Sequence, residues 1–579
     1  MTSWERVYEK WNSFQQLEPS LKEELDQLEG DQTALEDAFY KELSFGTGGM
    51  RGVIGAGINR MNVYTIRKAV NGLANYLLEH TVNVKDRGVV ISYDSRHMSR
   101  EFALETAKVL GAYGITAYVF TSLRPTPLLS FAVRYLGAVS GVMITASHNP
   151  PEYNGFKVYN EDGGQITPDQ ASKIISYIGE TQDELLVPYL EQDQLEEKEL
   201  LNWVKDEIDN AYLERLVQIS KLHSDEIAEA KQMPFVFTPL HGTAYELVTS
   251  GLKQLNFNNV HIVGEQALPD PEFSTVTSPN PEEHQAFSMA MELGKTIDAE
   301  ILLATDPDAD RLGVAVKKHT GDYQVLTGNQ LGALLLDYIL SHSDKALLKS
   351  GRMLKTVVTS ELGRAIADSY GIKTINTLTG FKYIGEKIHE FDATGESFVF
   401  GYEESYGYLI SSFARDKDAV QAAMMACEMA YYWKKQDKTL LDVLHGLYEK
   451  HGFYLEGMTS LTFKGKEGSE QISAIMDSIR QHPMESIADF QVEKIEDYLT
   501  GERIIVDEKE KVEEIELPNE NMMKFILEQD SWVCLRPSGT EPKIKCYYGV
   551  CGKNVQDSKD KLTALQKEMD EQLNLSTKR

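Results

Sequence analysis

Short apolar runs alternate with stretches of helical spacing along most of the chain. In the first third, apolar runs at 88–92, 115–120 and 139–144 are separated by segments whose apolar residues recur at helical intervals, beginning at Arg100 and Leu128. A short apolar run bounded by turn residues predicts a buried strand. The alternation of strands with helices predicts a largely parallel sheet covered by helices.

The same alternation returns twice, and a different pattern closes the chain. We predict further strands at 235–238, 260–263, 301–304, 355–358 and 398–400, and a helix at 330–339. From about 453 the strands are shorter, at 461–463 and 533–535, and a charged helix begins at Val555. The sequence therefore predicts an α/β fold: three similar α/β units with mixed, largely parallel sheets, then a smaller α+β C-terminal domain. Three similar units in series suggest an internal repeat.

These patterns place domain boundaries at 1–205, 206–325, 326–450 and 451–579. An acidic leader that precedes the first strand is predicted to be helical. The acidic stretch 180–206, between the first two units, is interpreted as a solvated helical connector.

Length and composition agree with several folded domains. The chain has 579 residues, 42% of them hydrophobic and 25% charged, and a domain usually takes about 100–200 residues. The net charge of -31 repels phosphate backbones and anionic lipid surfaces, so we expect neither a nucleic-acid nor a membrane partner. A small anionic ligand would need a local concentration of positive groups.

Cysteine use and the chain start point to the cytoplasm. The four cysteines show no Cys-x-x-Cys spacing and are too few for a disulfide framework. The start Met-Thr-Ser-Trp-Glu-Arg lacks the apolar core of a secretion signal, and no run of about 18 apolar residues occurs.

Thr145-Ala-Ser-His-Asn-Pro-Pro151 directly follows a predicted strand. The two prolines cannot extend a strand, so the chain leaves the sheet and holds Ser147 on a bend. Open α/β sheets place their chemistry at such strand ends. A serine hydroxyl alone is a poor nucleophile, and no Gly-x-Ser-x-Gly motif surrounds it. A Ser/Thr turn or a helix cap is the alternative interpretation.

Asp306-Pro-Asp-Ala-Asp-Arg311 also follows a predicted strand. Its three aspartates, Asp306, Asp308 and Asp310, alternate and can converge on one hard cation. An EF-hand loop would need glycine and glutamate where Arg311 and Lys317 stand. Three aspartates with few other ligands suit Mg²⁺, which keeps positions open for water or phosphate oxygen. The alternative is a solvated acidic turn.

Arg536-Pro-Ser-Gly-Thr-Glu-Pro-Lys543 also directly follows a predicted strand, the one at 533–535 in the final domain. Its small hydroxyl residues and Gly539 let backbone N–H groups approach an anion, and Arg536 can pair with a phosphate through two hydrogen bonds. The segment is predicted to be a phosphate nest and not a P-loop. A plain turn with an exposed arginine is the alternative.

Gly401-Tyr-Glu-Glu-Ser-Tyr-Gly407 offers carboxylate and hydroxyl acceptors between glycines, which suit vicinal sugar hydroxyls. A solvated hairpin turn is the alternative.

Gly46-Thr-Gly-Gly-Met-Arg-Gly52 is a glycine-rich loop with one arginine. It fails as a dinucleotide-binding motif because Arg51 takes the place of the third glycine and no clear strand precedes it. It could still contact phosphate; a flexible turn is the alternative.

Four loops thus combine a serine, an acidic cluster, acceptors for sugar hydroxyls and a phosphate nest. Together these residues resemble the α-D-phosphohexomutase superfamily. The chain length and the Gly-Thr-Gly-Gly-Met-Arg-Gly form are similar to its bacterial phosphoglucomutase branch, close to the phosphopentomutases. The resemblance covers about 45–547 and implies four domains around a central cleft.

The resemblance also implies site residues. Ser147 would carry a phosphoryl group whose oxygen, with Asp306, Asp308 and Asp310, binds one Mg²⁺ per chain. Glu403 and Ser405 match the family's sugar-binding loop, although that loop here holds an additional tyrosine. The residues that match the phosphate-binding loop are Arg536, Ser538, Gly539 and Thr540. Further active-site groups that the resemblance implies are Arg51, His148, Lys157, Arg311, Lys382 and Lys417.

The implied activity is the interconversion of α-D-glucose 1-phosphate and D-glucose 6-phosphate, with glucose 1,6-bisphosphate as intermediate. Ser147 would rest as a phosphoserine and donate, with Lys417 and His148 as candidate bases. Phosphomannose and phosphopentose mutation remain alternatives, and a sugar-phosphate phosphatase is a more distant one, since it needs no second anion site. A monomer or weak homodimer in the cytoplasm is expected.

Overall fold

A computed structural model describes residues 2–46, 48–222, 230–463, 465–508, 511–538 and 543–576. The chain divides into two compact units, of which the first holds 1–331 and 381–439 and the second holds 332–380 and 440–579. Gly539 and Thr540, expected in the phosphate nest, lie outside the described residues. In the described part of the chain, no helix combines the length and apolar character needed to cross a bilayer.

The leader forms three helices with their own apolar core. They are α1 (Ser3–Ser13), α2 (Pro19–Gln27) and α3 (Gln32–Phe39). Asp31 caps α3 by accepting a hydrogen bond from Ala34 N. Trp11, fully buried, packs edge-on against Phe39. The expectation of a helical leader is confirmed.

The first sheet has the strand order β1-β2-β6-β5-β3-β4-β7. Its strands are β1 (Phe45–Gly46), β2 (Gly49–Val53), β3 (Val89–Tyr93), β4 (Ala117–Phe120), β5 (Ser140–Ile144), β6 (Tyr153–Tyr159) and β7 (Leu201–Val204). The pairs from β5 through β3 and β4 to β7 are parallel, and those from β5 through β6 and β2 to β1 are antiparallel. The sheet is therefore mixed, and the sequence pattern found its parallel half.

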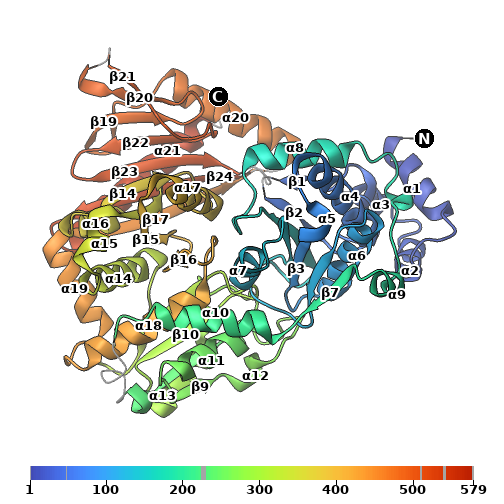
Figure 1. The fold of residues 1–579 in the computed structure, drawn as a ribbon. Helices are drawn as coiled ribbons and strands as arrows, with labels where there is room; N and C mark the ends of the chain where they lie inside the picture. The colour runs from blue at the N-terminus through green and yellow to red at the C-terminus, as the bar shows by residue number, and fades with distance from the viewer. Residues whose placement is uncertain are drawn as a thin grey trace. The chain divides into compact units, whose positions relative to one another are not determined.

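Helices cover both faces of this sheet (Figure 1). The packed helices are α4 (Val63–His80), α6 (Ser99–Ala112) and α8 (Pro168–Gly179) on one side, and α7 (Thr126–Leu136) and α10 (Asp206–Gln218) on the other. Asn62 starts α4 with a capping box, and Gly137, in the left-handed region at φ 65°, ends α7. Two short helices, α5 (Val84–Arg87) and α9 (Gln192–Glu197), lie in connections.

The interpretation of 180–206 as a solvated connector is wrong in part. Residues Leu201–Val204 form β7, which pairs in parallel with β4. Leu201 and Val204 are buried, because this strand covers the edge of the sheet. The acidic residues around it dominate the composition of 180–206, so a four-residue strand gives no clear signal in the sequence.

The second sheet belongs to the same unit and has the order β12-β11-β10-β8-β9. Its strands are β8 (Phe235–Thr238), β9 (Val260–Ile262), β10 (Ile301–Thr305), β11 (Leu312–Lys317) and β12 (Tyr323–Val325). The helices beside it are α11 (Tyr245–Gln254), α12 (Gly264–Ala267), α13 (Ser288–Ile297) and α18 (Ala419–Lys434). The unit also holds α17 (Phe381–Thr394) and the hairpin of β15 (Ser397–Tyr402) and β16 (Tyr408–Leu409). The predicted strands at 235–238, 260–263, 301–304 and 398–400 are confirmed.

The second unit contains a parallel pair, β13 (Gly351–Thr356) and β14 (Lys373–Thr377), and a large antiparallel sheet. Its helices are α15 (Lys345–Ser350), α16 (Leu362–Ser369), α19 (Leu440–His451), α20 (Gly465–Gln481) and α21 (Val555–Ser576); α14 (Gly328–Ser341) leads into it. The strand predicted at 355–358 lies at 351–356, so the prediction overlaps it only at Lys355 and Thr356. Arg352 and Lys355 interrupt the apolar pattern of this strand.

The antiparallel sheet carries the order β17-β24-β23-β22-β19-β20-β21, with β18 beside β19. These strands are β17 (Phe453–Thr462), β18 (Ser486–Ile487), β19 (Phe490–Asp497), β20 (Glu502–Ile505), β21 (Val512–Glu514), β22 (Met523–Leu527), β23 (Ser531–Pro537) and β24 (Lys543–Gly552). Helix α21 packs on β24 and β17. The helix predicted from Val555 is confirmed. The strands predicted at 461–463 and 533–535 overlap the longer β17 and β23, so the expectation of shorter strands in this region is wrong.

Candidate functional site

Ser147 lies in the loop that connects β5 with β6. Its backbone occupies the left-handed region, at φ 51°, and the residue is only 4% exposed. Ser147 Oγ donates a hydrogen bond to Asp306 Oδ2 at 2.7 Å and lies 3.2 Å from Nδ1 of His148. The serine predicted from the first sheet and the aspartate predicted from the second are therefore in direct contact.

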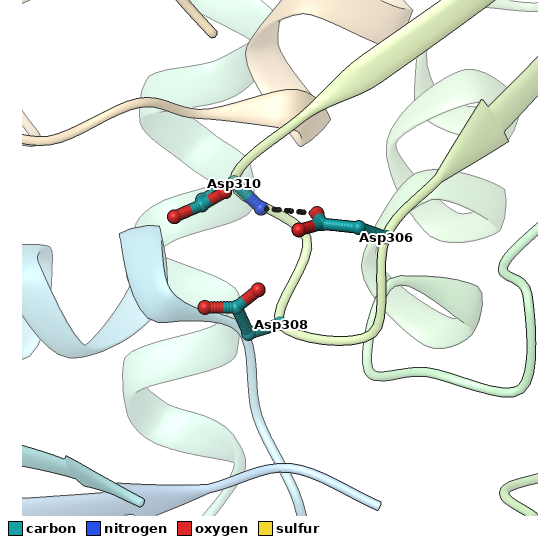
Figure 2. A group of neighbouring side chains, drawn as sticks. All are labelled: Asp306, Asp308 and Asp310. Carbon is teal, nitrogen blue, oxygen red and sulfur yellow. Dashed lines mark hydrogen bonds between the residues drawn. The ribbon is translucent and has the colours of Figure 1, made fainter. Parts of the chain in front are cut away.

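The three aspartates lie on the turn between β10 and β11 (Figure 2). Asp306 Oδ1 accepts hydrogen bonds from the backbone N–H groups of Asp310, at 3.1 Å, and Arg311, at 3.0 Å. These bonds curl the turn so that one oxygen of each carboxylate lies within 4.8 Å of the others. All three aspartates are buried.

Two lysines neutralise part of this charge. Lys157 Nζ lies 2.8 Å from Asp308 Oδ2 and 3.6 Å from Asp310 Oδ2, and Lys417 Nζ lies 3.0 Å from Asp310 Oδ2. Burial disfavours the ammonium form of Lys417, but the carboxylates of Asp310 and Asp416 hold its pKa above the usual range. Lys157 comes from β6, whose register beside β2 pairs Arg51 with Gly155, so Lys157 and Arg51 lie on the same face of the sheet.

The aspartates differ in their surroundings. Burial and the neighbouring carboxylates of Asp308 and Asp310 raise the pKa of Asp306 well above its usual value. Burial acts in the same direction on Asp308, but the ammonium of Lys157 outweighs it and lowers the pKa of Asp308. Such a split within one cluster is typical of functional sites.

The donor set fits a hard divalent cation. Asp308 Oδ1 and Asp310 Oδ1 are buried and accept no hydrogen bond. Buried carboxylate oxygens without a partner are costly unless a cation balances them. Oxygen-only ligands of this kind are preferred by Mg²⁺.

Arg51, His148 and Arg311 surround the cluster. Arg51 Nη1 donates to Asn149 Oδ1 at 2.7 Å, in the loop of Ser147. Arg311 pairs with Glu282. Burial and the cations of Arg311 and Arg51 lower the pKa of His148 to about 2, so its ring is neutral at neutral pH.

The loop that holds Glu403 and Ser405 contacts the aspartate turn. Leu312 N donates to Tyr406 O at 3.0 Å, and Arg311 forms a β-bridge with Gly407. Glu403 N in turn donates to Gly407 O at 2.9 Å, which closes the β15–β16 hairpin. Glu403 is buried and Ser405 is half-buried. The loop forms a hairpin, but the hairpin is not solvated as the alternative interpretation held: it packs against the aspartate turn, and Glu403 is buried.

Lys382 lines a cavity of about 290 Å³ together with residues of α17 and of the segment that follows β6. Its Nζ lies 5.1 Å from the ring centre of Tyr383. Arg536 and Ser538 lie in the second unit, where Arg536 Nε donates to Glu520 Oε1 at 2.7 Å and Ser538 N donates to Lys543 O at 2.8 Å.

Several residues at the site escaped the sequence reasoning. Asp416 contacts Lys417 Nζ at 3.3 Å and accepts a hydrogen bond from Tyr159, and Thr126 Oγ1 donates to Asp308 Oδ2 at 3.0 Å. Arg96 donates to the backbone of the Ser147 loop. Its signal was present, because Asp94-Ser95-Arg96 follows a strand end as the recognised loops do.

Four family models match the chain in order. Three describe the α/β/α domains I, II and III of phosphoglucomutase/phosphomannomutase and match 42–184, 210–321 and 327–451; the fourth describes the C-terminal domain and matches 502–572. The predicted fold class, three α/β units followed by a different final domain, is confirmed. The individual domain boundaries stay a prediction.

Curated relatives and solved structures agree with these matches. The phosphoglucomutases of Staphylococcus aureus strains RF122 and USA300 are each 40% identical over 531 residues, which is 91% of this chain and 93% of theirs. The phosphoglucomutase parafusin from Paramecium, in an open form, has a TM-score of 0.67 at 17% identity and covers 93% of this chain and 95% of its own. A phosphoglucomutase/phosphomannomutase family protein from Burkholderia thailandensis has a TM-score of 0.65 at 19% identity, covering 92% and 97%.

Proposed function

Because the chain belongs to the phosphoglucomutase/phosphomannomutase family, we propose that it interconverts α-D-glucose 1-phosphate and D-glucose 6-phosphate. Ser147 carries the phosphoryl group, and glucose 1,6-bisphosphate is the intermediate. The observation that carries the proposal is the 2.7 Å hydrogen bond from Ser147 Oγ to Asp306, within a buried triad of aspartates. The 40% identity to curated phosphoglucomutases supports glucose as the sugar.

Ser147 acts first as a donor, which removes the difficulty of a weak serine nucleophile. The incoming sugar hydroxyl attacks the phosphorus, and the bond from phosphorus to Ser147 Oγ breaks. Such a transfer depends on alignment and charge neutralisation. We propose that Asp306, Asp308 and Asp310, together with the phosphoserine, would hold Mg²⁺, which would supply positive charge beside the transferring group.

The side chains around the triad align the group. Arg311, fixed by Glu282, and Lys157, fixed by Asp308, present cations beside Ser147. Arg51 is held by Asn149 on the same loop. Cations fixed in advance stabilise developing charge without reorganisation during the reaction.

We propose two groups for the exchange of a proton with the sugar hydroxyl. Lys417, bound to Asp310 and Asp416, is cationic and must first pass on its own proton before it can accept one, whereas His148, beside Ser147 Oγ, is already neutral. The variants Lys417→Met and His148→Gln separate their roles, because loss of the group that takes the proton lowers kcat far more than loss of its neighbour.

Recognition of the sugar phosphate is assigned to three segments. Glu403 and Ser405 accept hydrogen bonds from sugar hydroxyls, and Lys382 contacts the ligand from α17. The nest of Arg536, Ser538, Gly539 and Thr540 holds the phosphate that is not reacting, since the bisphosphate must turn over between its two transfers. We further propose that the protein works in the cytoplasm as a monomer or weak homodimer.

The experiment replaces the proposed phosphoryl carrier. Purified protein is expected to carry one phosphoryl group at Ser147 by intact-mass and peptide mass spectrometry, and Ser147→Ala to abolish glucose mutase activity. Ser20→Ala, at an exposed position of α2, is the matched control. Unchanged turnover in Ser147→Ala would contradict the mechanism, and a higher kcat/KM with mannose or ribose 1-phosphate would reassign the sugar.

A further inference from the structure

The side chain of Arg96 lies at the centre of the loop that carries Ser147. Its Nη2 donates to Ser147 O at 2.6 Å and also to Asn149 O. Its Nη1 donates to Pro150 O at 2.7 Å and to Tyr153 O at 3.0 Å. One guanidinium therefore donates hydrogen bonds to four backbone carbonyls within residues 147–153.

Arg96 is itself fixed from the opposite side. Its Nε lies 3.4 Å from Asp94 Oδ2, and both side chains are fully buried. Asp94 Oδ1 accepts hydrogen bonds from Ser99 Oγ at 2.7 Å and from Arg96 N at 3.0 Å. The carboxylate balances the buried charge, although Nε and Oδ2 form no hydrogen bond with each other.

The loop of Ser147 needs such support. Ser147 occupies the left-handed region, which a residue with a side chain adopts only when its surroundings impose it. Pro150 and Pro151 offer no N–H group to local hydrogen bonds. Pro150 O also accepts a hydrogen bond from Tyr153 N at 3.1 Å, so the carbonyls that depend most on Arg96 are those of Ser147 and Asn149. A carbonyl left unpaired inside the fold is costly.

A segment of the second sheet's domain completes the enclosure. The ring of Phe273, which is buried, lies 4.9 Å from the guanidinium carbon of Arg96. Its neighbour Glu272 contacts His97 at 2.5 Å. Arg96 thereby links the strand end after β3, the loop after β5 and the region that follows α12.

We propose that Arg96 is a positioning residue that holds Ser147 in one conformation for phosphoryl transfer. It touches neither sugar nor phosphate and acts through the backbone that it binds. The inference rests on the proposed function, in which Ser147 gives and receives the phosphoryl group. Transfer requires Ser147 Oγ to stay within a fraction of an ångström of its place beside Asp306.

Arg96→Lys tests the proposal. A lysine keeps the charge but presents a compact ammonium with three N–H bonds, which cannot span four carbonyls. We expect kcat to fall about 10- to 100-fold while KM for glucose 1-phosphate stays within about twofold. Hydrogen–deuterium exchange without substrate should rise in peptides from 146–155 and stay unchanged elsewhere. Arg100→Lys, an exposed arginine four residues on, is the matched control and should leave kcat and exchange unchanged.

Phe273→Leu provides a second variant, for the case in which Arg96→Lys does not fold. It leaves the hydrogen bonds of Arg96 in place and removes the aromatic face, so the same changes are expected at smaller size. If Arg96→Lys keeps the wild-type kcat and the wild-type exchange at 146–155, the proposal is overturned. Faster exchange spread over the whole chain of this variant would overturn it as well. If wild-type protein lacks mutase activity but Arg96→Lys still loosens only 146–155, the proposed function fails and the holding role of Arg96 stands.

Discussion

Gly407→Ala is predicted to disable the site by displacing Lys417. A Cβ at position 407 would lie 2.3 Å from Cδ and 2.8 Å from Cγ of Lys417. Ordinary contact begins at 3.4 Å, so the middle of the lysine side chain must move by about 1 Å. Lys417 is nearly buried, with 14% of its side chain exposed, and it has little room to move without withdrawing Nζ from Asp310.

The size of the effect follows from that displacement. A misplacement of about 1 Å at a reacting centre costs about 100-fold in rate, or about 2.7 kcal/mol of transition-state stabilisation. Overpacking should lower the free energy of unfolding by about 1–3 kcal/mol. We therefore expect a folded enzyme with a strongly reduced kcat.

The assay is steady-state glucose mutase kinetics, with urea unfolding as the test of folding. Gly446→Ala, in α19, is the matched control, because a Cβ there meets no atom within 4 Å. It should leave kcat unchanged. A Gly407→Ala enzyme whose kcat stays within about threefold of the wild type would refute the assigned position of Lys417.

Three further outcomes are expected. Removal of divalent metal should abolish activity, Mg²⁺ should restore it, and Asp308→Asn should raise the Mg²⁺ concentration for half-maximal activity more than about 10-fold; activity that survives chelation would contradict the triad's role. Trp11→Ala should cost about 3–5 kcal/mol of unfolding free energy and Trp4→Ala, half-buried on the same helix, less; equal costs in urea unfolding would count against the leader's core. Burial lowers the pKa of Lys355 to about 8, so between pH 8 and 10.5 the unfolded chain binds one proton more than the folded chain, and the free energy of unfolding rises with pH. Urea unfolding at pH 8 and pH 10 should show this rise in the wild type and not in Lys355→Met; the same pH dependence in both proteins would refute it.

Much of the fold could be predicted because strands of parallel sheets are continuous apolar runs. The runs before Ser147 and Asp306 are of this kind, so both loops were located at strand ends. The antiparallel strand β6 mixes polar with apolar residues and carried no such signal, whereas β11 is a buried, mostly apolar run that the same pattern could have revealed. The strand β7 was missed because its three apolar residues, Leu201, Trp203 and Val204, follow a long acidic stretch.

The pattern of apolar and polar residues could not predict contacts between segments that are distant in the sequence. Nothing in the sequence says that Arg96 faces four carbonyls of another loop, or that Asp416 and Tyr159, 257 residues apart, share a hydrogen bond. Family resemblance supplied the residue types at the site, and only the folded chain supplies the distances. The general rule that chemistry collects at strand ends would have brought Asp94-Ser95-Arg96 into view.

The most direct test follows one phosphoryl group. Enzyme labelled with phosphate at Ser147 is mixed with excess unlabelled glucose 1-phosphate, and the products of a single turnover are separated. The account predicts that the label passes into glucose 1,6-bisphosphate and glucose 6-phosphate while Ser147 becomes rephosphorylated from the substrate. Label released as inorganic phosphate, or label that stays on Ser147 while glucose 6-phosphate forms, would contradict it.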